Sequence, residues 1–537
     1  MKGSKRIFIA CFGFAVLTAM AAFVGCDRKC KHVWEASVHA PTCALEGYTD
    51  YVCSVCGERK GGEREKIVPA TGEHLWQEES CSVCGTSYAD WLQKEGYALG
   101  DEFYDFTLSE DGTYCLSAYR SVLPEKVVLP SSHRGKPVTR VGKHAFQGCE
   151  RLQEIVLLRG ISELEDGVFS DCKNLTSLIV SDGVTKIGAG AFSNCENLTS
   201  VSVGNALTVI GENAFALTGY SNRQDNWENN VLYLTASDQK TSYLLDAKRE
   251  LSGTCVVKEG TKTIADFAFY ECDKLTEIVL PESVTEIGQS AFRDCRNLTS
   301  VRIPDGVTRM GACAFWNCGA LKALKLPSGL TGIEANAFYK CRSLEAIDLP
   351  KGVTEIGYSA FYGCEGLTSV ALPDKVKILD DFAFAQCKGL ERVTLGNSLT
   401  RLGRSAFSGC GKLRDVLLPD SVTELGGGAF SECRSLTSIV IPDGVIGVGE
   451  SSFWGCTSLT DVVIGDGATK IGRYAFYECG NLTNIVIPAG IVSVGDFAFD
   501  GCERLTDVFY RGNQSQWEKV QIGEGNAFLT GATLHFQ

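Results

Sequence analysis

The chain has 537 residues, of which 44% are hydrophobic and 22% charged, and its formal net charge is −14. One conventional hydrophobic core cannot grow to this length, so the chain must form several domains or a long stack of repeats. The negative charge argues against a nucleic-acid partner, because phosphate binding requires a basic surface.

The first 25 residues have the layout of an export signal. Three basic residues precede an apolar run over residues 7–23. Residues 23–26 read Phe-Val-Gly-Cys, which resembles the lipobox of bacterial lipoproteins. This resemblance implies cleavage before Cys26, acylation of its sulfur, and an exported chain anchored by lipid to the bacterial cell envelope and exposed at the surface. A plain signal peptide or an uncleaved anchor helix is the alternative.

Residues 26–94 hold Cys and His at spacings typical of a small metal module. Cys-Ser-Val-Cys-Gly occurs twice, and such turns let two thiolates face one tetrahedral zinc ion. Either the two motifs share one ion, or the first motif joins Cys43 and a His. The segment resembles short Cys/His modules of exported bacterial proteins, which implies the second grouping; disulfides or a metal-free module are the alternatives. The candidate ligands of this structural zinc are Cys43, Cys53, Cys56, His32, His74, Cys81 and Cys84.

From residue 146 onward the chain repeats itself every 23 residues. Phe recurs at this step from Phe146 to Phe215 and again from Phe269 to Phe499. A fixed period of this length with a Leu-rich pattern predicts leucine-rich repeats. The gap between the two runs is 54 residues, which is two units plus eight, and it predicts an enlarged, irregular coil over residues 220–251.

The unit 272–295 shows the physical logic of the repeat. Ile278 and Leu280 are two residues apart and therefore share one face of a short strand. A second extended leg follows, Gly288 permits the bend after it, and a short helical turn is expected to carry Phe292 inward. One unit cannot bury these groups alone, so stacked coils must share one continuous core.

The unit L-x-x-I-x-L/I-P-x-x-V-T-x-I-G-x-x-A-F-x-x-C resembles the BspA-type leucine-rich repeats of bacterial surface proteins, from about residue 124 to 510. Residues 111–115 with 135–139, and residues 509–512 with Trp517, resemble the terminal caps of that family. The resemblance implies an α/β leucine-rich-repeat solenoid, mostly short strands with short helical turns. The repeats would span 146–510, flanked by an N-terminal cap and first coil at 95–145 and a C-terminal cap at 511–537. It also implies an extracellular binding or adhesive role.

Fourteen of the 25 cysteines stand three residues after a repeat Phe. We expect a row of small, buried, reduced thiols that pack under the turns. Disulfides between adjacent coils are the alternative, and a metal chain is disfavoured because no His accompanies these positions.

Two outward rows are candidate binding faces. The middle residue of each strand should point outward, from Val156 at the start to an apolar run near the end, and aromatic residues follow the repeat Phe on successive coils. Strand propensity and mutual packing of neighbouring turns are the respective alternatives. The candidate residues are Leu417, Val440, Val463, Val486 and Phe509 in the first row, and Trp316, Tyr339 and Tyr362 in the second.

No motif in the chain predicts an enzyme, because no nucleophile motif, Gly-rich phosphate loop or convergent set of acid and base groups is evident. The sequence predicts a lipid-anchored surface protein that presents a rod to an extracellular protein or glycan, with no cofactor in the repeats. The alternative is an envelope scaffold that associates with itself through the apolar run, without an external ligand.

Overall fold

The structure, a computed structural model, describes residues 92–99, 102–119 and 123–537, and before them the backbone of five short strands. These strands are β1 (Trp34–His39), β2 (Gly47–Cys53), β3 (Glu65–Val68), β4 (Trp76–Gln77) and β5 (Ser80–Cys81). β2 pairs in antiparallel fashion with β1 and β3, and β4 pairs with β5. The predicted signal segment and Cys26 lie outside the described residues.

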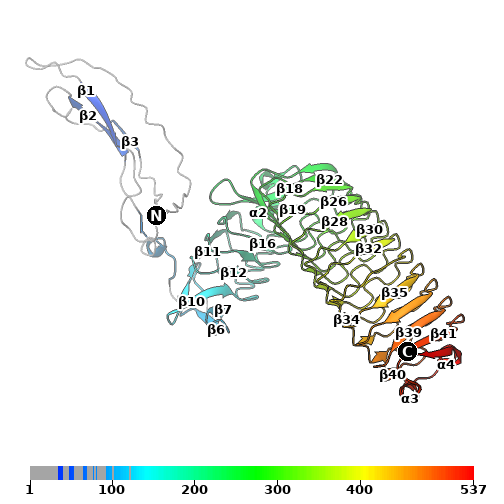
Figure 1. Cartoon of the computed structure of the whole chain (residues 1–537). Coiled ribbons are helices and arrows are strands. Elements are labelled where there is room, and N and C mark those ends of the chain that lie inside the picture. Colours follow the sequence, from blue (N-terminus) through cyan, green and yellow to red (C-terminus); the bar gives the residue numbers. More distant parts are fainter. Residues whose placement is uncertain are drawn as a thin grey trace, which may run out of the picture.

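The repeats form a solenoid in which most coils contribute a first strand and a second strand (Figure 1). First strands of neighbouring coils pair in parallel, as do second strands, with a shift of 23 residues, for example Ile278 with Val301 and Ile287 with Met310. Because the shift equals the repeat length, equivalent residues lie above one another along the whole stack. The predicted solenoid of stacked 23-residue coils is confirmed.

The first strands are β8 (Lys126–Leu129), β11 (Glu154–Leu157), β13 (Ser177–Val180), β15 (Ser200–Ser202), β20 (Gly253–Val256), β22 (Leu275–Val279), β24 (Ser300–Arg302), β26 (Ala323–Lys325), β28 (Ala346–Asp348), β30 (Ser369–Ala371), β32 (Arg392–Thr394), β35 (Ser438–Ile441), β37 (Asp461–Ile464), β39 (Asn484–Pro488) and β41 (Asp507–Arg511). The second strands are β10 (Lys136–Val141), β12 (Glu163–Leu164), β14 (Lys186–Ile187), β16 (Val209–Ile210), β21 (Thr261–Ile264), β23 (Glu286–Ile287), β25 (Arg309–Met310), β27 (Gly332–Ile333), β29 (Glu355–Ile356), β31 (Ile378–Leu379), β33 (Arg401–Leu402), β34 (Glu424–Leu425), β36 (Gly447–Val448), β38 (Lys470–Ile471) and β40 (Ser493–Val494).

Both ends of the solenoid carry added elements. At the N-terminal end these are β6 (Tyr104–Leu108), β7 (Tyr114–Tyr119) and β9 (Ser132–His133), and β7 pairs with β10 of the first coil. At the C-terminal end they are α3 (Gln514–Trp517), β42 (Gln521–Ile522), α4 (Ala527–Gly531) and β43 (Thr533–Phe536). β42 and β43 extend the two strand ladders by one step, which covers the strand edges of the last coil.

The core is a column of stacked phenylalanine rings. From Phe146 to Phe215 and from Phe269 to Phe499, successive rings lie 4.9–5.6 Å apart between centroids and within 22° of parallel. Each ring is fully or almost fully buried. One Phe per coil therefore fills the interior of its own coil and covers the rings of its neighbours.

The segment that carries each Phe is a pair of tight turns and not the expected helical turn. In the coil of Phe292, Ser290 and Asp294 both have positive φ, 53° and 60°, which interrupts any right-handed helix. Gly288 does not use the left-handed region; its missing side chain matters because a Cβ there would lie 2.6 Å from the backbone of Ala265. Close stacking of coils, and not the bend itself, explains this glycine.

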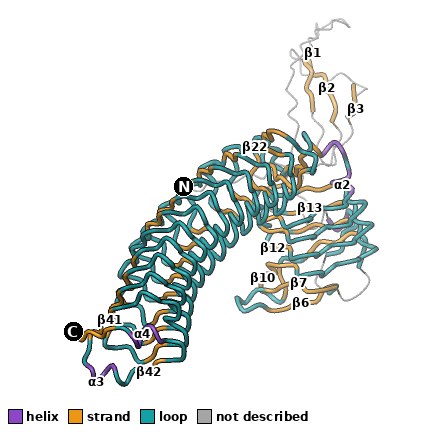
Figure 2. Tube along the Cα trace, turned by 90° about the vertical axis from the view of Figure 1, so that its right-hand side faces the viewer, coloured by secondary structure: helices purple, strands orange, loops and turns teal. Residues whose placement is uncertain are grey.

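The enlarged coil forms a small antiparallel meander where the solenoid changes direction (Figure 1 and Figure 2). Thr218 replaces the ladder Cys and caps α2 (Gly219–Asn222). The 3₁₀ turn η1 (Gln224–Asn226) and strands β17 (Trp227–Glu228), β18 (Val231–Thr235) and β19 (Ser242–Ala247) follow.

Hydrogen bonds join the coils on the two sides of this meander. The Asp266 amide, after the meander, donates to the Ile210 carbonyl before it at 2.8 Å, and within the meander the Tyr243 hydroxyl donates to the Gly204 carbonyl of the preceding coil at 2.8 Å. The insert is therefore an integral part of the solenoid at the point where its direction changes.

Candidate binding surfaces

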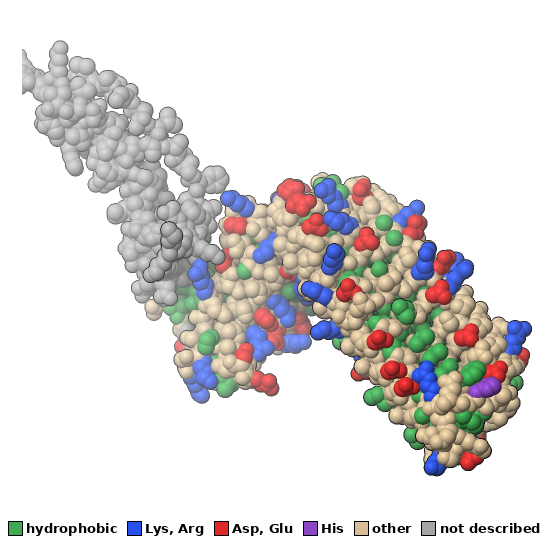
Figure 3. Space-filling view, viewed as in Figure 1, with side chains coloured by type: hydrophobic (Ala, Val, Ile, Leu, Met, Phe, Trp, Pro, Cys, Tyr) green, Lys and Arg blue, Asp and Glu red, His purple; other side chains and the backbone are tan. Residues whose placement is uncertain are grey.

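The first candidate surface is the C-terminal apolar row, which consists of Leu417, Val440, Val463, Val486 and Phe509. The last four residues lie in register on β35, β37, β39 and β41, so their side chains project from the same side of the sheet. Leu417 is 81% exposed and Val440 55% exposed, whereas Val463 and Val486 are partly exposed. Phe509 stacks on His535 of β43 with ring centroids 4.6 Å apart. Figure 3 shows hydrophobic side chains gathered on this half of the rod.

Acidic residues border the apolar row. Asp415, Asp461 and Asp507 each precede a member of the row by two positions, so they lie on the same side of the coils. Asp507 accepts a hydrogen bond from His535 at 2.7 Å, which holds the pKa of Asp507 below its ordinary value. The surface is thus an apolar strip with carboxylates along one edge.

At the N-terminal end the same outward row is covered by the chain itself. Val128 and Val156 are each only 2% exposed, because Leu92 and Tyr97 pack over them. The expectation that Val156 faces solvent is therefore wrong, although its side chain does lie on the outward side of the sheet. The covering segment had no repeat pattern by which the sequence could reveal it.

The aromatic row consists of Trp316, Tyr339 and Tyr362. Trp316 and Tyr339 stack at 3.9 Å between centroids, and Tyr339 and Tyr362 stack at 4.8 Å. The Arg293 guanidinium lies over the Trp316 ring at 5.1 Å. Because the rings and this cation cover one another's faces, the row mainly presents ring edges, and a sugar would find few free faces on which to stack.

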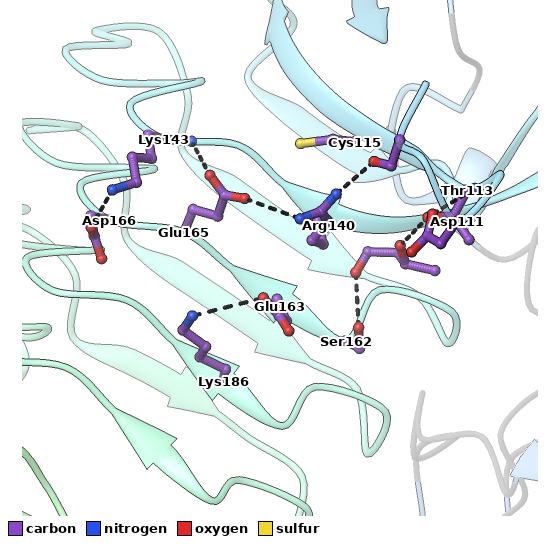
Figure 4. Close-up of polar contacts among 12 residues, drawn as sticks. Asp111, Thr113, Cys115, Arg140, Lys143, Ser162, Glu163, Glu165, Asp166 and Lys186 are labelled. Atoms are coloured by element: carbon purple, nitrogen blue, oxygen red, sulfur yellow. Dashed lines mark hydrogen bonds and ion pairs between the residues drawn. The ribbon is translucent and has the colours of Figure 1, made fainter. Parts of the chain in front are cut away.

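A groove of about 660 Å³ near the N-terminal cap is a surface that sequence reasoning missed (Figure 4). Arg140 donates to Ser109 at 2.6 Å and lies 4.0 Å from Glu165. Glu165 also accepts from the Lys143 amide, and the Lys143 ammonium pairs with Asp166 at 2.9 Å, which raises the pKa of Lys143. Glu110 and Asp111 also line the groove, so its carboxylates outnumber its two cations, Arg140 and Lys143, and the lining is polar with a small excess of negative charge.

A smaller hollow of about 230 Å³ lies where the solenoid changes direction. Asp166, Lys186 and Glu212 line it from the coils before the meander, and Asp266 and Gln289 line it from the coils after it. Burial raises the pKa of Asp266 above its ordinary value. Among the described residues, no group of three or more His, Cys, Asp or Glu side chains is placed to hold a metal ion.

The repeat cysteines form a ladder of free thiols that connects the coils. Each described ladder thiol from Cys295 to Cys502 donates to the carbonyl of the Phe 26 residues earlier, at 3.0–3.2 Å. The donor thus lies one coil beyond its acceptor. Burial raises the pKa of these thiols, to about 12 for Cys341 and Cys387. The thiols are inert structural groups and not nucleophiles.

The predicted zinc ligands are not tested by the structure. His32, Cys43, Cys56, His74 and Cys84 lie outside the described residues, and only the backbone is described at Cys53 and Cys81. The helices that the structure describes include none that is long and apolar enough to cross a membrane.

Comparison with known proteins identifies the repeats. The sequence profile of the BspA type leucine rich repeat region matches residues 118–231, 262–390, 313–435, 354–466 and 423–520. No curated protein sequence matches the chain.

Two solved structures illustrate the likeness among bacterial proteins. A leucine-rich repeat protein from Bacteroides ovatus is 24% identical, covers 82% of this chain and 99% of its own, and has a TM-score of 0.42. A leucine rich cell surface protein from Faecalibacterium prausnitzii is also 24% identical, with 79% and 97% covered and a TM-score of 0.27.

Proposed function

This chain belongs to the BspA type leucine rich repeat family, and we propose that it is a cell-surface binding protein whose solenoid engages an extracellular protein. Solenoids of this kind bind partners on extended outer surfaces, because their interior is filled by core side chains. The chemistry of the described residues supports binding better than catalysis: the ladder thiols are buried, and in the groove Arg140 pairs with Glu165 and Lys143 with Asp166.

The observation that carries the proposal is the exposure of the C-terminal apolar row. Contiguous apolar surface costs solvation free energy, so a row of this kind on a water-exposed rod indicates a contact site. A protein fits this surface better than a glycan, because the row presents aliphatic side chains while the aromatic faces of Trp316, Tyr339 and Tyr362 cover one another.

Substitutions in the row test the proposed function. We expect Leu417→Lys combined with Val440→Lys to weaken capture of an extracellular protein by about tenfold or more, because central apolar contacts dominate such interfaces. Binding of the full chain to a panel of immobilised extracellular-matrix proteins measures this. The matched control is Val256→Lys, since Val256 lies in the same outward row and is 69% exposed but belongs to a distant coil.

Other outcomes of that experiment separate the alternatives. If the double variant retains capture while Val256→Lys loses it, the row is not the site. If the wild-type chain captures only glycans on a parallel array, a protein partner is excluded. A concentration-dependent dimer that disappears in the double variant, without any captured protein, would establish the self-assembling scaffold instead.

We also propose that Cys26 carries the lipid anchor and that residues 26–94 hold a structural zinc ion. Expression of the full chain in a bacterial host with labelled fatty acid should label the wild-type chain and leave Cys26→Ser unlabelled. Release of the variant from the membrane fraction would follow, because one acyl group is no longer available to insert. Equal labelling of both chains would contradict the anchor.

Elemental analysis of the purified full chain tests the metal module. Absence of zinc from that sample would contradict the proposed zinc ion in residues 26–94.

A further inference from the structure

We propose that the C-terminal apolar row binds a short segment of a partner protein that carries aliphatic residues beside a tyrosine. The inference rests on the proposed function and names the chemistry of the partner. Its template lies within the same chain, where residues 92–99 cover the outward row of the first coils.

The same strand position is covered at the N-terminal end of the rod and exposed to solvent near the C-terminal end. Val156 and Val440 are the same residue at the same place on a first strand, yet Val156 is 2% exposed and Val440 55% exposed. Leu92 and Tyr97 of the covering segment pack over Val156, and no such segment is described over Val440. A strip that this fold covers at one end with a short peptide is left open at the other.

The covering segment shows which chemistry such a strip accepts. Leu92 and Tyr97 supply the apolar contact with Val128 and Val156. The Tyr97 hydroxyl donates to the Glu154 carboxylate, which also pairs with Lys126 at 2.9 Å. Burial opposes ionisation of Glu154, but these two partners outweigh it and hold the pKa of Glu154 below its ordinary value.

The C-terminal row repeats this arrangement of acceptor and apolar groups. Asp461 and Asp507 precede Val463 and Phe509 by two residues, as Glu154 precedes Val156. Asp461 already accepts from the Thr460 hydroxyl at 2.6 Å and from the Asn484 amide at 3.1 Å, one bond on each carboxylate oxygen. Each oxygen has a second lone pair and the residue is exposed, so the carboxylate can also accept from a tyrosine hydroxyl that arrives with an apolar segment. Val440, Val463 and Val486 lie on successive strands about 4.8 Å apart, a span that a few extended residues cover.

One difference between the two ends of the rod sets the affinity that we expect for a partner segment. Ala98 also pairs through its backbone with β8, the last strand of its sheet. The Ala98 amide donates to the Lys126 carbonyl at 2.9 Å, and the Val128 amide donates to the Ala98 carbonyl at 3.1 Å. β37 and β39 have strands on both sides, so their backbone groups are already paired. A partner segment there must bind through side chains alone and will bind more weakly than a segment that also pairs at an edge.

A second copy of the chain fits the row less well than a foreign segment. Two copies facing each other through this strip would bring the borders of Asp415, Asp461 and Asp507 together, and the chain already carries a net charge of −14. The charge therefore favours a partner whose segment supplies hydrogen-bond donors.

A peptide with the sequence of residues 90–100, labelled with a fluorophore, tests the inference on the full chain. Fluorescence anisotropy should show saturable binding to the wild-type chain. We expect Val440→Lys to weaken it by about tenfold or more and Asp461→Lys to weaken it severalfold, with Val256→Lys as the matched control without effect. A peptide in which Tyr97 is replaced by Phe should also bind severalfold more weakly.

Each other outcome would overturn the inference. Absence of saturable binding does so directly, as does equal binding to the wild-type chain and Val440→Lys. Binding that is lost only in Val156→Lys would mean that the peptide exchanges with the chain's own segment. Because Val440 and Asp461 are exposed, both variants should fold, and matching unfolding curves verify this. Failure of the peptide together with normal capture of an extracellular protein would leave the proposed function standing.

Discussion

Phe338→Ala is expected to lower the free energy of unfolding by about 3–5 kcal/mol, because it removes a large aromatic side chain from the core. Phe338 is fully buried, and its ring stacks on Phe315 at 5.6 Å and on Phe361 at 5.2 Å. Alanine would leave a cavity in the middle of the column and remove two ring contacts. Urea unfolding followed by circular dichroism measures the loss.

The Phe338→Ala substitution should also change the shape of the unfolding curve. Each coil contacts only its neighbours, so a gap in the middle of the column should uncouple the two halves and broaden the transition. Phe536→Ala is the matched control, because Phe536 lies on the last strand and is 42% exposed. If the two variants were destabilised equally, the stacked column would not be the source of stability.

Mildly alkaline solution is expected to unfold the solenoid. The ordinary pKa of a thiol is 9.0, and burial raises it to about 12 at Cys341, Cys387, Cys456 and Cys502. In the unfolded chain these thiols lose their protons above pH 9, whereas in the folded chain they keep them. Stability is therefore fully present below pH 9 and falls as the pH rises toward 12, by about 1.4 kcal/mol per thiol for each pH unit.

Because several thiols contribute, the summed loss of unfolding free energy should exceed the stability of an ordinary domain within one or two pH units above pH 9. Circular dichroism from pH 7 to 11 would follow the unfolding. The ordinary pKa of tyrosine is 10.0, so the interval between pH 9 and pH 10 reports mainly on the thiols. A fold that is unchanged at pH 10.5 would contradict this account.

Reaction with a thiol reagent offers an independent measurement of the same property. At pH 8 the ladder thiols of the folded chain should react far more slowly than those of the urea-unfolded chain, since both burial and protonation protect them. Among the cysteines that the structure describes, Cys115 and Cys313 are only half-buried and serve as internal controls that should react before the ladder thiols. Burial thus explains how a chain that we propose to be exported can retain reduced thiols.

The period of 23 residues was sufficient to predict the coils, the buried Phe column and the reduced state of the ladder thiols. These features depend on residues within one unit and on their copies in the next. The turn conformation was mispredicted as helical, although Asn or Gly at the left-handed positions, such as Asn194 and Gly363, were a usable signal.

The candidate surfaces could be predicted only in part. An outward position follows from alternation along a strand, so the row from Leu417 to Phe509 was recognisable. Whether such a position meets water depends on what else packs there, and the cover that Leu92 and Tyr97 place over Val156 joins segments far apart in the sequence. The groove at Arg140 was missed for the same reason, since its charges come from separate coils.

By itself the sequence determined the solenoid, because the same apolar pattern recurs in every unit and only stacking can bury it. The tertiary structure alone decided the change of direction at the meander, the pairing of charges between coils, and which part of the outward row is left open. Those features arise from contacts between segments that share no periodic pattern. The free energy of such contacts depends on the three-dimensional positions of the groups, which a linear pattern does not encode.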